Sequence, residues 1–289
     1  KSFRIFVQKR LITNLLLLIV VGVLTSVFIL SDKQVDEVKT ALLSDIDAAG
    51  IEHITVRQST KEDIVLNRQG QRWFVTSPVH AIAHTSRVNA ILHLLKSRSF
   101  AQIDVEDNSL EIYQLDPAIL SLRMNSHEFF FGTTEPIDDR RYVMFDNTIH
   151  LITDHLFHQL RQSSMFFVSP RLVPEWEIIS SIQFNDQIIS KEINSWTILP
   201  ANNAVSTEHL GSLAQHWKKA EARQILQYQG ADAEEKVILT YKSGRTAYFD
   251  VISKTPDLIL GRADLSLQYN LDRTMAERLL VVVSNPEVD

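Results

Sequence analysis

The sequence predicts an α+β protein with one N-terminal transmembrane helix and two similar halves, each an antiparallel sheet with a packed helix. Residues 11–30 form an uncharged apolar run, and short segments of alternating apolar and polar residues follow from residue 51 onward. Two longer segments, one on each side of residue 170, carry apolar residues at helical spacing. We therefore divide the chain into a basic tail (1–10), a transmembrane helix (11–30), a stalk (31–50), a first half (51–170) and a second half (171–289).

The apolar run at residues 11–30 has the length of a membrane span. At about 1.5 Å of rise per residue, a helix over this run is about 30 Å long, which matches the hydrocarbon core of a bilayer. Lys1, Arg4, Lys9 and Arg10 precede the run, and no acidic residue accompanies them. Because short basic flanks stay in the cytoplasm, we expect a bacterial inner-membrane protein with a cytoplasmic N-terminus and a periplasmic C-terminal part.

A cleaved signal peptide is the competing interpretation of the run. The apolar region of a signal is usually about 7–15 residues long and ends at a small-x-small cleavage site. Here the run is longer and gives way to Ser31-Asp32-Lys33, so we expect an uncleaved anchor. Within it, Gly22 and Ser26 are four residues apart, a spacing that lets a second helix approach closely. We expect these two residues to contact integral membrane subunits within the lipid bilayer.

The composition limits the partners and sites that the chain can have. The net charge is −6, and because the first ten residues carry four basic side chains and no acid, the rest carries −10. Such an acidic body is a poor match for nucleic acid. The absence of cysteine excludes disulfides, thiolate zinc sites and a cysteine nucleophile. With only 8 Gly and 8 Pro, the periplasmic part is predicted to be folded throughout.

The elements of the first half follow from changes in periodicity. Apolar positions within 32–49 recur at near-helical spacing, which predicts a juxtamembrane helix or stalk. From residue 51 the period becomes two, which predicts a three-stranded meander that ends at Pro78. A helix capped by Thr85 or Ser86 is expected next. Further strands are expected at 103–105, 120–124, 128–131, 142–145 and 149–152, with a short helix at 154–160.

The second half repeats this order after a proline-rich boundary at 169–175. The predicted strands are 178–184, 187–194, 196–200, 237–241, 247–251, 258–261 and 267–271, with a helix capped by Ser206 or Thr207 and a last helix at 274–279. The repeated order suggests an internal duplication. However, Tyr113-x-Leu115-Asp116 and Tyr269-x-Leu271-Asp272 follow their tryptophans at different distances, which does not suit a simple copy. A single sheet shared by both halves is the alternative.

Several short motifs in residues 51–280 are similar to those of a known family. They are the strand from Trp73 to Pro78 with its following helix, Tyr113-Gln114-Leu115-Asp116-Pro117, Phe129-Phe130-Phe131-Gly132, Arg141-Tyr142-Val143 and Arg262-x-Asp264-x-x-Leu267-x-Tyr269. With these motifs the chain resembles the bacterial domain of unknown function 4340 family. The resemblance implies a single-pass anchored, exported protein, and some members are linked with auxiliary subunits of gliding-type ABC exporters. It implies no catalytic residue.

No common catalytic signature is present in the sequence. Gly-x-x-x-x-Gly-Lys and Gly-x-Gly-x-x-Gly are absent, so nucleotide phosphates have no glycine-rich loop to bind. Gly-x-Ser-x-Gly and His-Glu-x-x-His are absent as well. Triads assembled from distant positions remain open. We expect a protein that is not an enzyme and has no cofactor.

The strongest candidate for chemistry is a histidine cluster at His150, His155 and His158. The last two are three residues apart on a predicted helix, and a nearby His150 would complete a nitrogen site for zinc or copper. A looser group follows Pro78 at His80, His84 and His93. The alternative is that these histidines only flank core segments, and we commit to no metal site.

Candidate partner contacts lie in the middle of the first half. Phe129, Phe130 and Phe131 cannot all point to one side of a strand, so one of them faces away from its own core. In the turn that follows, Asp138 and Asp139 could bind calcium or face a partner's basic patch, or form local ion pairs in solvent. We name Phe129, Phe131, Asp138 and Asp139 as candidate contacts. Trp73, Trp196 and Trp217 are expected in the core, and Trp176 is expected to wedge the two halves together.

These observations predict a non-catalytic, membrane-anchored periplasmic subunit that binds or braces partners in a larger membrane complex, with an ABC-type exporter as one candidate. Two alternatives remain. The chain could be an accessory subunit of a membrane-bound oxidase, or an anchored periplasmic enzyme or metal-binding protein that uses His150, His155 and His158. Metal analysis of the purified protein tests the metal-binding alternative. Identifying the proteins that are isolated together with the chain from native membranes distinguishes an exporter subunit from an oxidase subunit.

Overall fold

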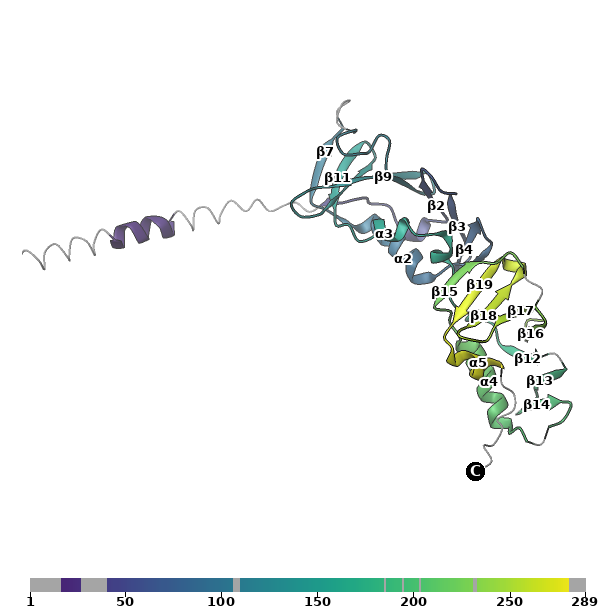
Figure 1. Cartoon of the computed structure of the whole chain (residues 1–289). Coiled ribbons are helices and arrows are strands. Elements are labelled where there is room, and N and C mark those ends of the chain that lie inside the picture. Colours follow the sequence, from purple (N-terminus) through teal and green to yellow (C-terminus); the bar gives the residue numbers. More distant parts are fainter. Residues whose placement is uncertain are drawn as a thin grey trace, which may run out of the picture.

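The computed structural model shows a mixed α+β protein with two large antiparallel sheets and few helices (Figure 1). It describes residues 17–26, 41–105, 110–184, 186–193, 195–202, 204–230 and 233–280. The predicted α+β class is confirmed. The alternative of one sheet shared by both halves is wrong for the described residues, because no strand of one large sheet pairs with a strand of the other.

The first large sheet has nine strands in the order β5-β4-β3-β2-β8-β9-β10-β11-β7. Neighbouring strands are antiparallel throughout. Its strands are β2 (His53–Gln58), β3 (Ile64–Gln69), β4 (Arg72–Ser77), β5 (Ala81–Ile82), β7 (Ala101–Asp104), β8 (Leu120–Met124), β9 (His127–Thr134), β10 (Arg141–Phe145) and β11 (Thr148–Ile152).

The second large sheet has eight strands in the order β14-β13-β12-β16-β17-β18-β19-β15, also antiparallel. Its strands are β12 (Ile179–Phe184), β13 (Gln187–Lys191), β14 (Trp196–Leu199), β15 (Gln224–Gln227), β16 (Glu235–Tyr241), β17 (Thr246–Ser253), β18 (Leu258–Arg262) and β19 (Leu267–Leu271).

Apart from the extra edge strand β5, the two sheets have the same strand order. In each, a three-stranded meander leads into a helix, the next strand of the sheet (β7 or β15) lies at the far edge, and a four-stranded meander fills the space between. A short helix follows the last meander strand in both, α3 (Phe157–Leu160) in the first half and α5 (Thr274–Leu280) in the second. Every strand of the second sheet therefore has a counterpart at the same place in the first sheet.

The main helices differ in how they begin. In α2 (Thr85–His93) the N-cap is His84, which makes no side-chain cap, so the predicted cap by Thr85 or Ser86 is wrong. In α4 (Thr207–Lys219) the N-cap is Ser206, whose Oγ accepts a hydrogen bond from the backbone N–H of His209 at 3.1 Å. The cap predicted for this helix is therefore confirmed. Short 3₁₀ helices lie at η2 (Ala48–Gly50), η3 (Leu94–Lys96), η4 (Ser164–Phe167) and η5 (Ala263–Leu265).

Each sheet turns one face toward its helices and buries it. The predicted alternation holds in both halves, with Ile54 and Val56 buried on β2 and Val237 and Leu239 buried on β16. Trp217 of α4 is fully buried, and its indole N–H donates to the carbonyl oxygen of Leu279 at 2.9 Å. The buried apolar side chains of both halves form one connected cluster.

The segment predicted as a juxtamembrane helix does not continue as one where the structure describes it. Ala41–Leu42 forms strand β1, which pairs with β6 (Arg98–Ser99). Leu43 follows with 2% exposure and belongs to the core. Of the apolar positions at helical spacing, Leu42 is 51% exposed whereas Ile46 packs against the core, so these residues do not form one buried helix face. Residues 31–40 of the predicted stalk lie outside the described residues.

Residues 17–26 form a helix whose side chains are all exposed. The rest of the predicted span, 11–16 and 27–30, and the basic tail 1–10 lie outside the described residues. Among the helices that the structure describes, none is both long and apolar enough to cross a membrane. A Cβ atom added at Gly22 would meet nothing within 4 Å, so the proposed helix contact at Gly22 and Ser26 stays a prediction.

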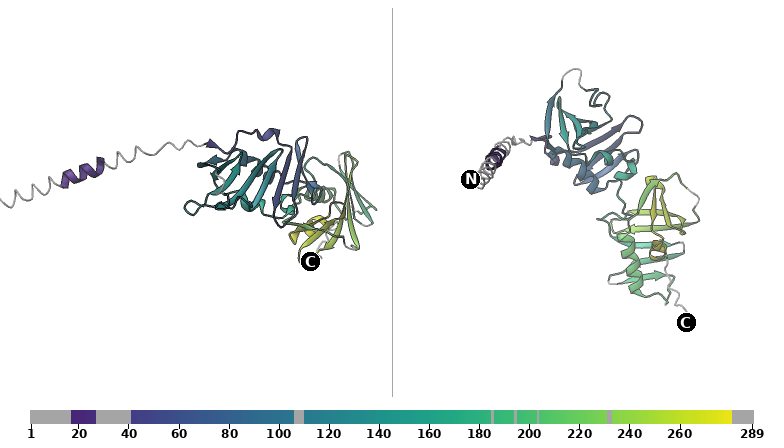
Figure 2. Two further views of the ribbon diagram at one scale, coloured as in Figure 1. Left: turned by 90° about the horizontal axis from the view of Figure 1, so that it is seen from above. Right: turned by 60° about the vertical axis from the view of Figure 1, so that its left-hand side comes forward.

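The two halves form two lobes that meet at one end (Figure 2). In the second half, the edge strand β15 lies against η4, which belongs to the first half. The connecting segment, residues 168–177, runs along the same junction. The two halves are therefore joined in one place, both by the chain itself and by the contact between η4 and β15.

Candidate functional site

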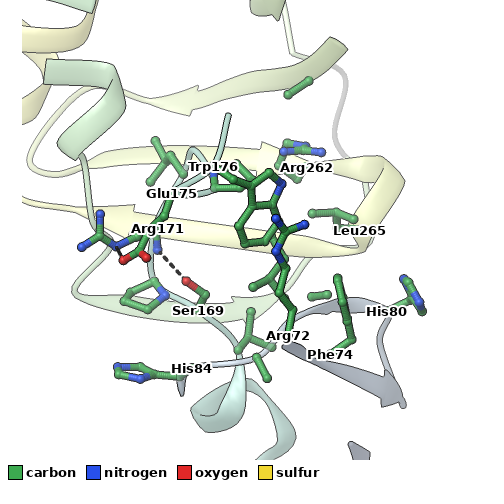
Figure 3. Close-up of a pocket in the computed structure, with 18 of the residues that line it drawn as sticks. Arg72, Phe74, His80, His84, Ser169, Arg171, Glu175, Trp176, Arg262 and Leu265 are labelled. Atoms are coloured by element: carbon green, nitrogen blue, oxygen red, sulfur yellow. Dashed lines mark hydrogen bonds and ion pairs between the residues drawn. The ribbon is translucent and has the colours of Figure 1, made fainter. Parts of the chain in front are cut away.

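A cavity with a volume of about 740 Å³ lies at the junction of the two halves (Figure 3). We call it the junction cleft. The first half lines it with residues of β4, the start of α2 and residues 80–84 between them. The second half contributes the ends of β16 and β18, the start of β17, η5 and β19, and the connecting segment completes the wall.

The connecting segment changes its hydrogen-bond partners within two residues. The backbone N–H of Ser169 donates to Ile82 of the first half at 2.8 Å. The carbonyl oxygen of Pro170 accepts from the N–H of Ala222 of the second half at 2.8 Å. Each half therefore holds its own end of the connection, and the chain passes between them over a single peptide bond.

Two charged side chains fix the second part of the connection to the second half. The ammonium group of Lys218 donates to the carbonyl oxygens of Pro174 at 2.8 Å and Glu175 at 2.9 Å, and also to that of Glu177. The carboxylate of Glu177 is buried and accepts from Arg245 and from Ser243 Oγ. Because Trp176 lies between these anchors, it belongs structurally to the second half.

Glu177 is an anion at neutral pH in spite of its burial. Burial acts to raise the pKa of its carboxyl group, but the hydrogen bonds from Arg245 and Ser243 outweigh that effect and leave the pKa below its ordinary value. Burial has the opposite sign for the cation and lowers the pKa of Lys218. The anchors of the connecting segment are therefore electrostatic.

Arg72 and Trp176 join the two halves across the cleft. The guanidinium carbon of Arg72, on β4, lies 3.8 Å from the centre of the Trp176 ring, and Figure 3 shows the arginine reaching over the indole. This is the geometry of a cation–π contact. The structure thus confirms that Trp176 lies between the two halves, as predicted from the sequence.

The arginines that line the cleft differ in how they are neutralised. Arg171 pairs with both Glu175 and Glu221, at 3.3 and 3.2 Å. The guanidinium of Arg262 donates two hydrogen bonds to the carboxylate of its neighbour Asp264, at 2.8 and 2.7 Å. Arg72 has no acidic partner among the described residues. The wall near Arg72 therefore carries a positive charge that the protein does not balance locally.

Two tyrosines lie beside Arg262 in the wall of the cleft. Burial raises the pKa of Tyr241 to about 12 and that of Tyr269 to about 12. Both phenols are therefore protonated at neutral pH. The hydroxyl of Tyr241 is enclosed and has no hydrogen-bond partner in the described part of the chain.

The two histidines that line the cleft are not paired with a hydroxyl group in its described wall. Its histidines are His80, which stacks on Phe74, and His84, whose pKa is lowered by burial and by the nearby Arg87. Neither histidine is hydrogen-bonded by its side chain to a hydroxyl of a described residue of the wall. The nucleophile–base pair that acyl transfer requires is therefore not assembled there in the described residues.

The histidine candidates named from the sequence are not gathered into a metal site. His150 is buried and its Nδ1 lies 3.0 Å from Ser99 Oγ, whereas His155 and His158 are exposed. Among the described residues, no three His, Cys, Asp or Glu side chains are placed to hold a metal ion. The periodicity did not reveal that His150 points into the core of its own half. The looser group of His80, His84 and His93 forms no such site either.

The candidate partner contacts divide into two kinds. Phe129 and Phe131 are buried at 0% and 1% exposure, so the prediction that they contact a partner is wrong; their side chains form the core, and Phe130 between them faces the other side. Asp138 and Asp139 are exposed, and Asp138 pairs with Arg140 at 2.8 Å. Their contact with a partner stays a prediction.

Sequence reasoning missed most of the cleft. Arg72, Arg245 and Tyr241 gave no signal, because each lies in an ordinary strand or turn and becomes part of a site only when the two halves meet. Trp176 was singled out by its place after two prolines, and Arg262 and Asp264 by the family resemblance. A charged residue at a strand end is too common a feature to indicate a site by itself.

Comparison with models of protein families, with curated proteins and with solved structures gave no match in any of the three. The resemblance to the domain of unknown function 4340 family therefore stays an expectation from the motifs. The functional argument has to come from the chain's own geometry.

Proposed function

We propose that this protein is a non-catalytic, membrane-anchored subunit whose two-sheet body binds partner proteins on the periplasmic side of the bacterial inner membrane. The observation that carries the proposal is the junction cleft, which combines a stacked Arg72–Trp176 pair with fixed walls from both halves and offers binding groups without a nucleophile–base pair. Concave sites of about 300–1,000 Å³ are typical of ligand binding, and the cleft falls within this range.

The membrane anchor is supported by the sequence and by the exposure of the helix at residues 17–26. Its side chains include Leu17, Leu18, Ile19 and Leu24, all more than half exposed. No described residue covers this apolar surface, which is costly in water and suits lipid or another helix. The orientation follows from the basic residues before the run.

An internal duplication accounts for the body of the protein. The shared strand order of the two sheets supports it, and the objection from the two similar Tyr-x-Leu-Asp motifs loses its force. Tyr113 lies in the loop before β8, whereas Tyr269 lies within β19, so the two tyrosines do not occupy equivalent places. Two copies of one module create a junction, and the junction is where the cleft forms.

The test is co-isolation from native membranes. The tagged full chain is purified in mild detergent and the accompanying proteins are identified, in parallel with Gly22→Leu in the helix and Trp176→Ala in the cleft. Integral membrane proteins are expected with the wild type, with fewer of them in each variant. Arg123→Gln is the control, because Arg123 is exposed and, among the described residues, pairs only with Glu128 on the first sheet. Wild-type protein that brings no membrane protein with it would contradict the proposal.

A further inference from the structure

The acids in the wall of the junction cleft do not match all of its charged donors. All three acids that line it are engaged, Glu175 and Glu221 by Arg171 and Asp264 by Arg262. The other side of the wall has donors to spare. Arg72 has no acidic partner in the described chain and is held over Trp176, which orients its guanidinium but satisfies none of its N–H groups.

The region around Arg262 adds further donors. Its Nε and Nη2 donate to Asp264, whereas its Nη1 makes no hydrogen bond to a described residue. The N–H groups of this nitrogen are therefore left for an acceptor on a ligand. An anion is the acceptor that suits a guanidinium best, because the hydrogen bonds are then charge-assisted.

The charge balance of the cleft indicates which kind of anion. At one end of the cleft, Arg171 faces Glu175 and Glu221 and Lys218 lies close by, so the charges there cancel, whereas the wall near Arg72 is positive. A polyanion such as a nucleic acid or an inositol phosphate would find no unmatched cation at the Arg171 end. A single carboxylate fits better, because a guanidinium binds it through parallel N–H donors.

The body of the ligand is indicated by the apolar part of the wall. Phe74, Ile82, Pro174 and Leu265 line the cleft together with the indole of Trp176. These surfaces suit apolar side chains next to the carboxylate. The volume of about 740 Å³ is large enough for a ligand of several linked groups rather than for a lone ion.

We propose that the junction cleft binds a carboxylate carried on a short apolar peptide, with the carboxylate accepting hydrogen bonds from Arg72 and from the spare N–H groups of Arg262. This inference deepens the proposed function and rests on it, since the peptide would be a segment of a partner protein. A terminal carboxylate and an acidic side chain share this chemistry, and the test separates them.

Binding is measured with the full-length protein in detergent by fluorescence anisotropy of labelled pentapeptides. The first probe is Ala-Leu-Ala-Leu-Ala with a free carboxyl terminus, and the second is the same peptide with a C-terminal amide. The third is the amidated peptide with its central residue replaced by glutamate. We expect the first or the third probe to bind at least about 10-fold more tightly than the second, since a charge-assisted hydrogen bond is lost in the amide.

The variant that tests the site is Arg72→Gln, which removes the charge at an exposed position. It is expected to weaken binding of the carboxylate probe by about 10-fold or more and to leave the amide probe unchanged. Arg57→Gln is the matched control, because Arg57 is also an exposed arginine of the first sheet but pairs with Asp63 outside the cleft.

Equal affinity for acid and amide probes, no binding by either carboxylate probe, or equal losses in Arg72→Gln and Arg57→Gln would each overturn the carboxylate site. Tighter binding of the first probe assigns the site to a chain terminus, and tighter binding of the third assigns it to an acidic side chain. Co-isolation of membrane partners does not depend on these peptides. If partners are recovered but no probe binds, the carboxylate inference fails while the proposed function stands.

Discussion

The outer faces of the two sheets carry different side chains, although the strands of both follow the same order. On the first, Arg57 pairs with Asp63 at 3.1 Å and Arg123 with Glu128 at 2.8 Å. On the second, side chains that are cross-strand neighbours form a row across five strands. The row consists of Leu199, Ile188, Gln183, Ile238 and Tyr248.

The difference shows which face specifies the topology. The buried faces of both sheets carry the alternating apolar residues that fix the register, because a slip by one residue would expose them. The outer faces contribute little to that choice and are free to differ. Leu199 is 62% exposed and Tyr248 53% exposed, which no requirement of the second sheet's own core explains. The following variants test how far the two halves are alike.

The largest effect is expected from the core of the second half. Trp217→Ala removes a fully buried ring that packs 5.2 Å from Phe249, together with its hydrogen bond to Leu279. The free energy of unfolding should fall by about 3–5 kcal/mol. Urea denaturation measures this loss, and the control Gln215→Ala, exposed on the same helix, should change it by less than about 0.5 kcal/mol. Equal losses in both variants would show that the ring is no anchor.

The next effect compares the buried ion pairs of the two halves. In the first half, Arg141 and Asp154 lie 2.7 Å apart, with side chains only 8% and 14% exposed. Arg141→Met leaves a buried carboxylate unpaired and should lower the free energy of unfolding by about 3 kcal/mol. Arg245→Met in the second half should cost less, because Arg245 is 63% exposed and Ser243 still donates to Glu177.

Urea denaturation of the two methionine variants gives the comparison directly. Adding Asp154→Leu to Arg141→Met should restore part of the stability, because no charge then remains buried without a partner. A larger loss for Arg245→Met than for Arg141→Met would reverse the ranking of the two pairs.

Acid should weaken the first half before the second. Burial lowers the pKa of His150 from its ordinary value of 6.5, so the folded state favours the neutral ring. Its contribution to stability is complete above pH 6.5 and is lost as the pH falls below that value. The pKa of Glu177 in the second half is lowered from 4.5, and its contribution is lost only as the pH falls below 4.5.

Thermal unfolding followed by circular dichroism at pH 7.5 and 5.5 measures the histidine effect. His150→Gln should reduce the fall in Tm between these two pH values, because the buried titrating group is gone. His155→Gln is the control and should leave the fall unchanged, since His155 is exposed. An unchanged fall in His150→Gln would mean that another group causes the acid sensitivity.

The smallest effect concerns the helix starts. Ser206→Ala removes the N-cap of α4 and should cost about 1 kcal/mol. Ser212→Ala, at an exposed position inside the same helix, should be neutral or slightly stabilising, because alanine is the better helix former. Chemical denaturation of both variants checks the difference. The helix α2 has no such cap to lose, since His84 makes no side-chain cap.

Much of the fold could be predicted because its buried faces have a clear period. The strand at 120–124 and that at 267–271 were predicted at their observed bounds, and each has three buried residues in alternation. The strands β5 and β6 were missed because each has only two residues, too few to show alternation. Strand β15 was missed because three of its four residues are exposed.

The position of β7 and β15 at the far edges could not be predicted either. Pairing between strands that are distant in the sequence depends on long-range packing, which periodicity does not report. The candidate site could not be predicted from the sequence for the same reason. Arg72, Trp176 and Arg262 come from three separate parts of the chain, and their common surface exists only after the two halves have docked.

The contact between η4 and β15 has a consequence for the way this chain avoids self-association. The edge of a sheet presents unpaired backbone groups to which the strand of another molecule can add. Because η4 precedes β15 in the same polypeptide, every molecule has already synthesised η4 when β15 is made. The edge strand β15 then has η4 to lie against. A fragment that begins at residue 171 lacks it, and we expect such a fragment to aggregate where the intact chain stays dispersed.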